Sequence, residues 1–316
     1  MKISSVRFYN APNVPVFFKG QMYDESKTPK AVVRNEMQDI PFDKSGFYTS
    51  NIKHKPILDD NTFQIRMWGY APLTEDKEDR AVVWNKNMLD LTYKISDMIS
   101  ENQSFDKILK TAEYGINKIN GRDYGKRDLD ERYYPLEEEN IRGQEYWDTY
   151  NNFEEYEKPE TVESYWKALH NTNKKTLHKP KANEEYKDAN TCKIIDREWR
   201  RKIYYGRNKE KPYYNLELAK REYNKLKLIK HPHIGDINRS CATIQWLIAQ
   251  ESPYAHGNDS IANVLTKAIY HSYGIKTGQI KAGHSLDFEA FYRDLDDYIK
   301  IYPHMFENET ALCYEN

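Results

Sequence analysis

The stretch "SPYAHGNDSIANVL", residues 252–265, is the part of the sequence that indicates the fold most strongly. An apolar segment ends just before it, near Glu251, and Pro253 disfavours a helix that continues through this point. Gly257 allows backbone conformations that larger residues avoid. The three residues after the glycine are all good N-caps for the apolar run that follows, namely Asn258, Asp259 and Ser260. The pattern predicts two helices joined by a tight turn.

Such a turn has the properties of an anion site. The first N–H groups of a helix lack intrahelical acceptors and lie at the positive end of the helix dipole, so they suit phosphate. We therefore expect the backbone of Gly257, Asn258, Asp259 and Ser260 to bind the phosphates of a ligand, with the ring of His256 facing it. A linker between two helices with no ligand has the same residue pattern, and local sequence does not separate the two.

Apolar residues at three- and four-residue spacings predict further helices on both sides of this turn. They lie at about 78–100, 104–120, 215–230, 236–250, 260–274 and 285–302. Ser104 is the expected N-cap of the second helix and Asn120-Gly121 its end, and Gly274 is the expected end of the helix at 260–274. Residues 1–75 read as an irregular leader with short strand-like pieces. Residues 126–190 read as an inserted lobe with a short helix at 161–170. The chain is thus predicted to be mainly α, with a helical core formed by 76–125 and 191–316, and with short β elements.

Composition narrows the class of partner. The net charge of the 316 residues is −1, which favours neither nucleic acid nor a membrane. Acids dominate residues 128–163 and bases dominate 193–230, either as two surfaces that attract one another or because the basic stretch borders an anionic ligand. Three scattered cysteines predict no disulfide framework or zinc site. No apolar segment is suited to a Sec signal peptide or to a membrane span.

The turn resembles the Fic signature, His-Pro-Phe-x-(Asp/Glu)-Gly-Asn-Gly-Arg-x-x-Arg. Pro253, Gly257 and Asn258 match it, and Tyr254 is a close replacement for the phenylalanine. The fold that this resemblance implies is the helical core of the Fic/Doc/AvrB (Fido) superfamily, with a smaller lobe over its cleft.

The departures from the Fic signature affect the residues that carry its chemistry. Ser252 stands at the catalytic histidine, and His256 stands at the metal-binding acid. Asp259 replaces the second glycine, and Ser260 and Asn263 replace the two arginines. Serine is no unaided general base, and Mg²⁺ prefers oxygen ligands to imidazole. Standard AMP transfer with a metal is therefore disfavoured.

The AvrB-type branch of this superfamily, type III effectors of plant-associated bacteria, has lost the same residues. Residues 76–125 and 212–300 resemble AvrB in the order and spacing of their segments. In the AvrB type, an arginine just before the glycine and an aspartate beyond the next helix help to form the ligand pocket. The matching positions here are His256, where the arginine is lost, and Asp287.

The resemblance implies an effector that transfers a glycosyl group from a nucleotide sugar (ADP, UDP or dTDP type) to a host protein hydroxyl, without metal. Asp287 and His256 are its predicted catalytic residues, the acid accepting a proton or holding the sugar and the protonated histidine stabilising the leaving diphosphate. Asp287 is also suited to a first-turn acid of a helix, and His256 to a solvated turn histidine. The alternatives are a catalytically inactive binding module and a noncanonical AMP or UMP transferase.

The same resemblance implies delivery into the host cytosol by a type III-like route without a Sec signal peptide. Residues 1–75 are expected to dock a secretion chaperone, as in effectors generally. The remaining partner is the host target protein, with no nucleic acid and no integral membrane contact.

Overall fold

The computed structural model of the chain describes residues 41–49, 55–63, 75–121, 125–126, 133–135, 179–197, 200–205, 210–281 and 286–307. All of them lie in a compact unit, Gln38–Asn316, that is separate from the unit Met1–Met37. The helix predicted at 161–170 and most of the predicted leader lie outside the described residues. The domain boundaries at 75, 125 and 190 stay predictions.

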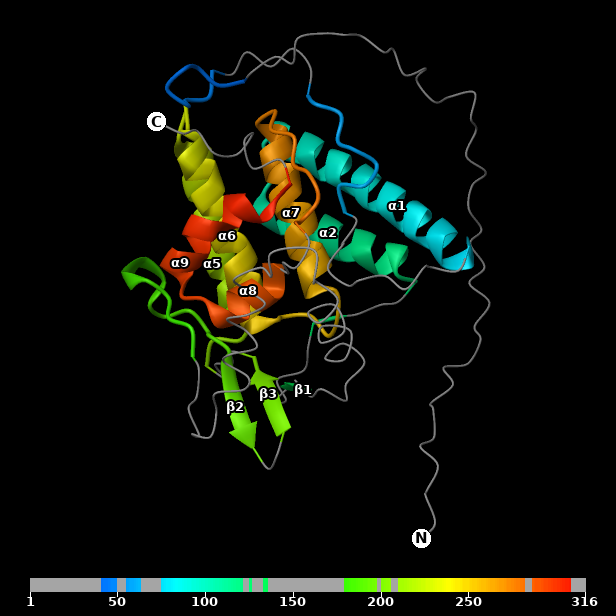
Figure 1. Cartoon of the computed structure of the whole chain (residues 1–316). Coiled ribbons are helices and arrows are strands. Elements are labelled where there is room, and N and C mark those ends of the chain that lie inside the picture. The colour runs from blue at the N-terminus through cyan, green and yellow to red at the C-terminus, as the bar shows by residue number, and fades with distance from the viewer. Residues whose placement is uncertain are drawn as a thin grey trace, which may run out of the picture. The chain divides into compact units, whose positions relative to one another are not determined.

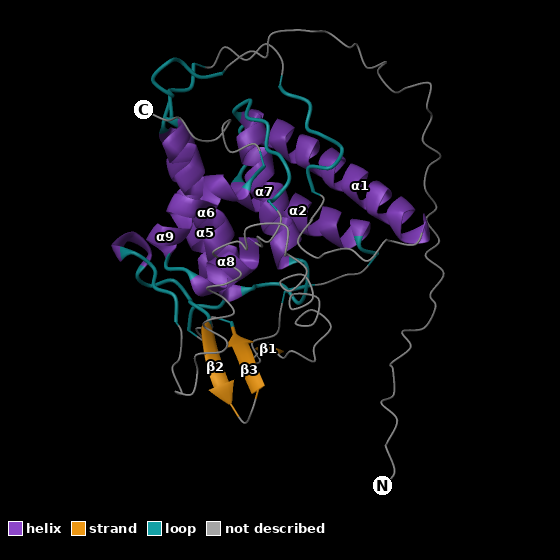
Figure 2. Cartoon of the chain, in the orientation of Figure 1, coloured by secondary structure: helices purple, strands orange, loops and turns teal. Residues whose placement is uncertain are grey.

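The described part is mainly helical, which confirms the predicted class (Figures 1 and 2). The α-helices are α1 (Glu75–Ser100), α2 (Phe105–Ile119), α5 (Tyr214–Leu228), α6 (Ile234–Glu251), α7 (Asn258–Ser272), α8 (Leu286–Tyr292) and α9 (Leu295–Ile301). Two 3-10 helices are η3 (Glu184–Tyr186) and η4 (Tyr302–Met305), and three strands are β1 (Tyr133–Pro135), β2 (Lys193–Arg197) and β3 (Arg200–Tyr204).

Helices α6 and α7 form the centre of the core. Nearly every residue of α6 from Ile237 to Glu251, and every residue of α7 from Ile261 to His271, is buried. Helix α6 packs against α5, α7, α8 and α9, while α7 packs against α1 and α2 as well. Both helices also bury polar side chains, among them Gln250 and Glu251 of α6 and Lys267 of α7, and buried polar groups of this kind need hydrogen-bond partners inside the core.

The helix ends follow local capping rules at several predicted positions. The Ser104 side chain accepts a hydrogen bond from the Lys107 N–H and caps α2, and Asn120 ends that helix. Gly274, with φ 74°, follows α7 in the left-handed conformation that favours glycine. These three predictions are confirmed.

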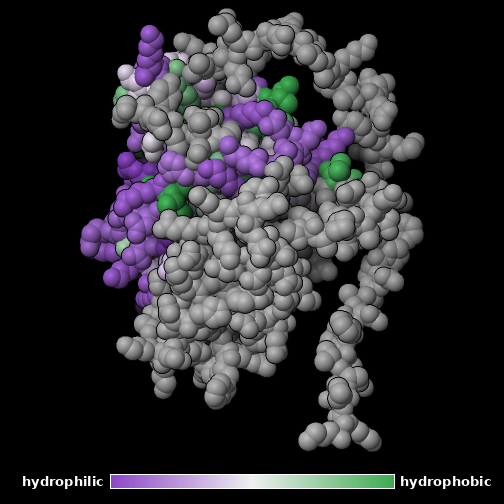
Figure 3. Space-filling model, in the orientation of Figure 1, coloured by the Kyte–Doolittle hydropathy of each residue, from purple (hydrophilic) through white to green (hydrophobic). Residues whose placement is uncertain are grey.

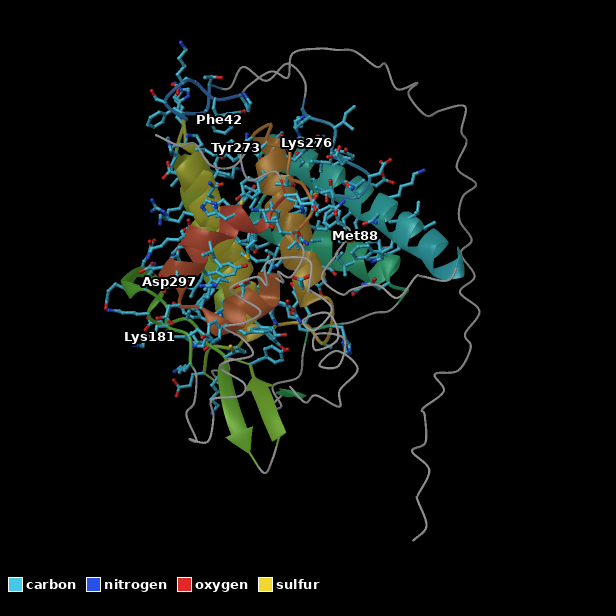
Figure 4. The ribbon with its side chains drawn as sticks, in the orientation of Figure 1. Phe42, Met88, Lys181, Tyr273, Lys276 and Asp297 are labelled. Atoms are coloured by element: carbon cyan, nitrogen blue, oxygen red, sulfur yellow. The ribbon has the colours of Figure 1, made fainter. Side chains whose placement is uncertain are left out.

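The predicted last helix, 285–302, is wrong in one respect, because it is split into α8 and α9. Asp294 adopts an extended backbone conformation, and its carboxylate accepts a hydrogen bond from the Lys181 N–H at 2.8 Å. The Leu295 N–H in turn donates to the Lys181 carbonyl at 2.9 Å. A distant segment thus takes the bonds that a continuous helix would make; Figure 4 labels Lys181 of this segment and Asp297 of α9.

The strands form one antiparallel sheet in the order β1-β3-β2. Tyr133 lies opposite Tyr204, and Lys193 lies opposite the same residue from the other side. The sheet joins residues from both sides of the boundary predicted at 190. The lobe predicted for 126–190 therefore shares hydrogen bonds with the segment that follows it.

The described surface is hydrophilic over most of the face seen in Figure 3. Exposed large apolar side chains include Ile57, Val82, Val83, Tyr114 and Leu228. No helix within the described residues is long and apolar enough to cross a bilayer.

Candidate functional site

The turn between α6 and α7 begins at Ser252. This residue is buried and adopts a left-handed conformation (φ 48°, ψ 62°), and its N–H donates to the Ile248 carbonyl at 2.8 Å. A non-glycine residue in this region carries a backbone cost of roughly 1–2 kcal/mol. Ser252 therefore ends α6.

Asn258 holds the turn closed. Its Oδ1 accepts from the Tyr254 N–H at 2.8 Å, and its Nδ2 donates to the Tyr254 carbonyl at 2.9 Å. Both side-chain groups are thus engaged within the turn, so the predicted contact of Asn258 with a ligand would have to use its backbone N–H. Asn258 therefore has a structural role that its spacing to Tyr254 alone does not reveal.

Replacing Asn258 by alanine is expected to remove both bonds to Tyr254 and to lower the free energy of unfolding by about 1–3 kcal/mol. Asn258→Asp keeps the acceptor for the Tyr254 N–H and is expected to lose less. Chemical denaturation of the three proteins measures this difference. Equal stability of Asn258→Ala and the wild type would contradict the role of Asn258 in closing the turn.

The helix after the turn begins without a side-chain cap. Its N-cap is Gly257 (φ 76°, ψ 10°), whereas the sequence indicated Asn258, Asp259 or Ser260 for this position. That prediction is wrong because Asn258 uses its side chain backwards, on Tyr254, and the helix starts one residue earlier. Glycine has no side chain with which to cover the first N–H groups of α7, so the geometry of an anion site is retained.

The carboxylate of Asp259 lies on the inner side of the turn. It accepts a hydrogen bond from Gln245 Nε2 of α6 at 3.3 Å. Its charge also acts on the buried phenol of Tyr302, whose pKa is raised well above its usual value by burial, by Cys241 and by Asp259. A ligand at the turn would therefore meet the backbone of Asp259 together with a nearby negative charge.

The charges of Asp259 and Asp287 both act on the buried Tyr298, whose pKa is raised first by burial, then by Tyr302, and then by Asp259, Glu289 and Asp287. The Tyr298 hydroxyl donates to the carbonyl of Leu286, at the start of α8. Asp287 itself is half-buried in the first turn of α8. The prediction that Asp287 contacts a ligand stays a prediction.

His256 and Ser260 differ in how far the turn exposes them. His256 is exposed, and Ser260 is half-buried. The exposure agrees equally with a solvated turn histidine and with a side chain available to a ligand, so the two interpretations of His256 remain.

A lysine that sequence reasoning missed adjoins the turn. The Ala255 N–H donates to the Gly125 carbonyl at 3.2 Å, and Lys126 pairs with Tyr254 in an isolated antiparallel bridge. Lys126 is exposed, and its Nζ lies 4.9 Å from the ring centroid of Tyr213. The backbone of Lys126 thus adjoins the turn, while its ammonium packs over the ring of Tyr213. No local signal could have found it, since more than a hundred residues separate the two segments.

A buried polar network fixes the chain that leads into β2 against the last turn of α6. Glu251 Oε1 accepts from Asn190 Nδ2 at 2.6 Å, and Glu251 Oε2 accepts from the Asn215 N–H at 2.9 Å. Asn190 and Asn215 bond to one another as well. Gln250 accepts from the Cys192 N–H at 2.8 Å. Two consecutive side chains of α6, directly before the turn, therefore anchor the segment entering the sheet.

Part of the basic stretch 193–230 pairs with acids close to it. Lys220 lies 2.6 Å from Asp106, and Lys225 lies 2.5 Å from Glu185 and 3.3 Å from Glu222. None of these acids belongs to the acidic stretch 128–163, which lies almost wholly outside the described residues. Surface pairs of this kind contribute little stability, on the order of 0–1 kcal/mol each.

A known protein family matches the part of the chain that contains the turn. Residues 234–309 match the avirulence protein family AvrB_AvrC. The match covers about a quarter of the chain, from the start of α6 to just beyond η4, and includes both Gly257 and Asp287. No curated protein sequence matches the chain.

The AvrB_AvrC match supports the AvrB-type resemblance of the segment from α6 to α9. Lys126 and the strands lie outside the matched residues. Within the described residues there is no group of three or more His, Cys, Asp or Glu side chains arranged to hold a metal ion.

Proposed function

We propose that this chain is an AvrB-like effector whose α6–α7 turn binds the diphosphate of a nucleotide sugar and transfers the glycosyl group to a hydroxyl of a host protein. The observation that carries the proposal is the start of α7 at Gly257 without a side-chain cap. The AvrB_AvrC match over the same helices supports it.

The residues around the turn divide the chemistry among them. The backbone N–H groups that open α7 hold the diphosphate, which needs no proton exchange with the protein. The exposed side chains of His256 and Lys126 offset the charge that develops as the bond between the sugar and the diphosphate breaks. Asp287 accepts the proton of the acceptor hydroxyl as the new bond to the sugar forms. No metal is required by this scheme.

The proposed setting is the cytosol of a host cell, reached by a type III-like route without a Sec signal peptide. Its partner there is the host protein that carries the acceptor hydroxyl. Docking of a secretion chaperone on residues 1–75 belongs to the same proposal. The AvrB_AvrC match supports an avirulence effector and is the basis of these three statements.

A binding module without catalysis is the second candidate, and the charges near the turn favour it. Asp259 and Asp287 act together on Tyr298, which places two negative charges near the proposed diphosphate site. Asn263, at the second arginine position of the Fic signature, is buried and offers no charge. A site with these charges is better suited to a peptide with cationic groups than to a diphosphate.

Thermal unfolding with ADP, UDP and UDP-sugars, with and without Mg²⁺, tests the proposal. A ligand at 100 times its Kd stabilises the folded protein by about 2.7 kcal/mol, which is a readily measured rise in Tm. We expect this rise without Mg²⁺ in the wild type and its loss in Gly257→Trp. Gly274→Trp is the matched control, because Gly274 has nearly the same φ (74° against 76°) at the opposite end of α7.

The outcomes separate the candidates. A shift retained in Gly274→Trp and lost in Gly257→Trp supports binding at the turn. Glycosyl transfer is then supported if the wild type releases the nucleoside diphosphate from a bound nucleotide sugar and Asp287→Asn does not. Absence of any shift with the whole series would leave the binding module as the better description.

A further inference from the structure

Residues 55–63, here called the clasp, lie across α1 and α7 (Figure 1). In the sequence they are far from the α6–α7 turn. The Leu58 N–H donates to the Tyr93 hydroxyl of α1 at 2.9 Å. Lys55 Nζ lies 2.9 Å from Asp97, also on α1. The side chains of Leu58 and Phe63 are each only 2% exposed. The clasp is therefore docked by both polar and apolar contacts.

The other end of the clasp meets the segment that follows α7. Asp59 pairs with Lys276 at 2.7 Å, and the Thr62 hydroxyl reaches the Thr277 carbonyl at 3.5 Å; Figure 4 labels Lys276 there. The ion pair is partly exposed, and the hydroxyl contact is long. Such contacts hold a segment weakly, since exposed pairs contribute on the order of 0–1 kcal/mol.

His271, in the last turn of α7, links the clasp to α1 with both ring nitrogens. Its Nδ1 lies 2.7 Å from Ser96 Oγ, and its Nε2 lies 2.9 Å from the Pro56 carbonyl. Lys55 Nζ donates to the same Ser96 Oγ at 3.1 Å. The ring is buried, at 3% exposure.

The neighbours of His271 dictate where its proton lies. A carbonyl can only accept, so Nε2 carries the proton and donates to Pro56. In the neutral ring Nδ1 is then an acceptor, so Ser96 Oγ donates its own hydrogen to Nδ1 while it accepts from the Lys55 ammonium. A charged ring would instead place an imidazolium and the Lys55 ammonium on the same hydroxyl oxygen, so the docked clasp favours the neutral imidazole.

A second proton on the ring would reverse one of these bonds. Nδ1 would become a donor, and Ser96 Oγ would then face two donors, from His271 and from Lys55. The charged groups that face the ring are Lys55 on the clasp and Asp97 on α1, and the aromatic ring of Tyr93 packs edge-on at 5.0 Å. Burial lowers the pKa of His271 most, the Pro56 carbonyl raises it, Lys55 lowers it and Asp97 raises it, and the net result lies below the usual 6.5.

We propose that the clasp is an acid-sensitive device, and that its release from α1 and α7 is coupled to the uptake of one proton by His271. Once released, the imidazole is solvated and takes up the proton at its ordinary value near 6.5, above that of the docked ring. A group whose pKa is depressed in the docked state favours that state at high pH. The docked clasp is therefore favoured above pH 6.5, and the released fraction grows as the pH falls below this value.

The size of the effect follows from one proton. Below pH 6.5 and above the docked pKa, the equilibrium constant for opening rises by up to about tenfold for each pH unit. Opening of this kind is local, because these bonds join the clasp to α1, to α7 and to the segment after α7, and not to the buried centre of α6. It does not depend on whether the turn binds a nucleotide.

Hydrogen exchange of the full chain between pH 7 and pH 5 tests the device. After correction for intrinsic exchange, the opening constant at the Leu58 amide should rise by up to about tenfold per pH unit in the wild type. His271→Gln keeps a donor for Pro56 and an acceptor for Ser96 but takes up no proton, so its opening constant should be independent of pH. His304→Gln, a change at an exposed histidine of η4, should behave as the wild type.

The proposal is overturned if the opening constant at Leu58 shows the same pH dependence in His271→Gln as in the wild type. It is also overturned if the opening constants at amides of α6 rise equally, because that would indicate global unfolding. If His271→Gln does not fold, an NMR titration of the wild-type ring decides instead. A His271 pKa at or above 6.5 in the folded chain would remove the coupling.

Discussion

Glu251→Ala is expected to lower the free energy of unfolding by about 2–5 kcal/mol. The change leaves Asn190 Nδ2 and the Asn215 N–H without their acceptors in a buried region. Each buried donor that loses its partner costs about 1–3 kcal/mol. Denaturant titration followed by tryptophan fluorescence measures the loss.

Glu251→Gln is the matched control for this change. It keeps one acceptor oxygen and the side-chain volume, but it turns an amide donor toward one of the two donors, so we expect an intermediate loss. The alanine variant should also weaken protection from hydrogen exchange at Cys192, the residue that enters β2. Wild-type stability in Glu251→Ala would mean that α6 does not anchor this segment through Glu251.

Lys267→Met is expected to stabilise the chain by about 2 kcal/mol at pH 7. Lys267 is fully buried on α7, where its Nζ donates to the Gly278 carbonyl at 2.8 Å and lies near the rings of Phe63 and Phe306. Burial lowers its pKa from 10.5 to about 7, and Asp259 opposes this only in part. By linkage, a pKa that falls from 10.5 to about 7 on folding costs the folded chain about 4 kcal/mol at pH 7, and the loss of the bond to Gly278 and of the contacts with the two rings offsets part of the gain in the variant.

The pH dependence of the Lys267 effect fixes its cause. Between pH 7 and 10.5 the unfolded chain binds a proton at Lys267 that the folded chain has lost, so the free energy of unfolding rises with pH in the wild type. From pH 7 to pH 9 this contribution amounts to about 2 kcal/mol. The advantage of Lys267→Met should therefore shrink over this range. A difference between the two proteins that stays constant from pH 7 to pH 9 would show that burial of the charge is not its origin.

Local rules predicted the parts of the fold that depend on neighbours in sequence. The α6–α7 pair, the end of α6 before Pro253, the Ser104 cap and the stop at Gly274 all follow from spacing and from single-residue preferences. The family resemblance was supported for the segment from α6 to α9. These features involve contacts within a few residues, which a sequence pattern encodes directly.

Features that depend on distant segments were not predictable in this way. The break between α8 and α9 follows from the bonds of Asp294 and Leu295 to Lys181, over a hundred residues away. Lys126 reaches the turn, and Glu251 meets Asn190, by the same kind of long-range contact. The N-cap at Gly257 escaped prediction because the orientation of one side chain, Asn258, decides between neighbouring positions.

The site is predicted in part. The sequence pointed to the turn and to Asp287, and the structure places the charges of Asp287 and Asp259 around Tyr298. It did not indicate that Asn258 is engaged by Tyr254, or that the carboxylate of Asp259 turns toward Gln245. The ligand roles of His256, Gly257 and Ser260 stay predictions, as do the nucleotide sugar and the host protein.

The most direct test of the proposed function is an NMR titration of the ¹⁵N-labelled chain with UDP in the absence of metal. If the N-terminus of α7 binds the diphosphate, the amide signals of Gly257 to Ser260 should shift most and to saturation, and those around Gly274 should stay in place. Saturating shifts confined to other parts of the chain, or no shift at residues 257–260 at millimolar UDP, would contradict the account.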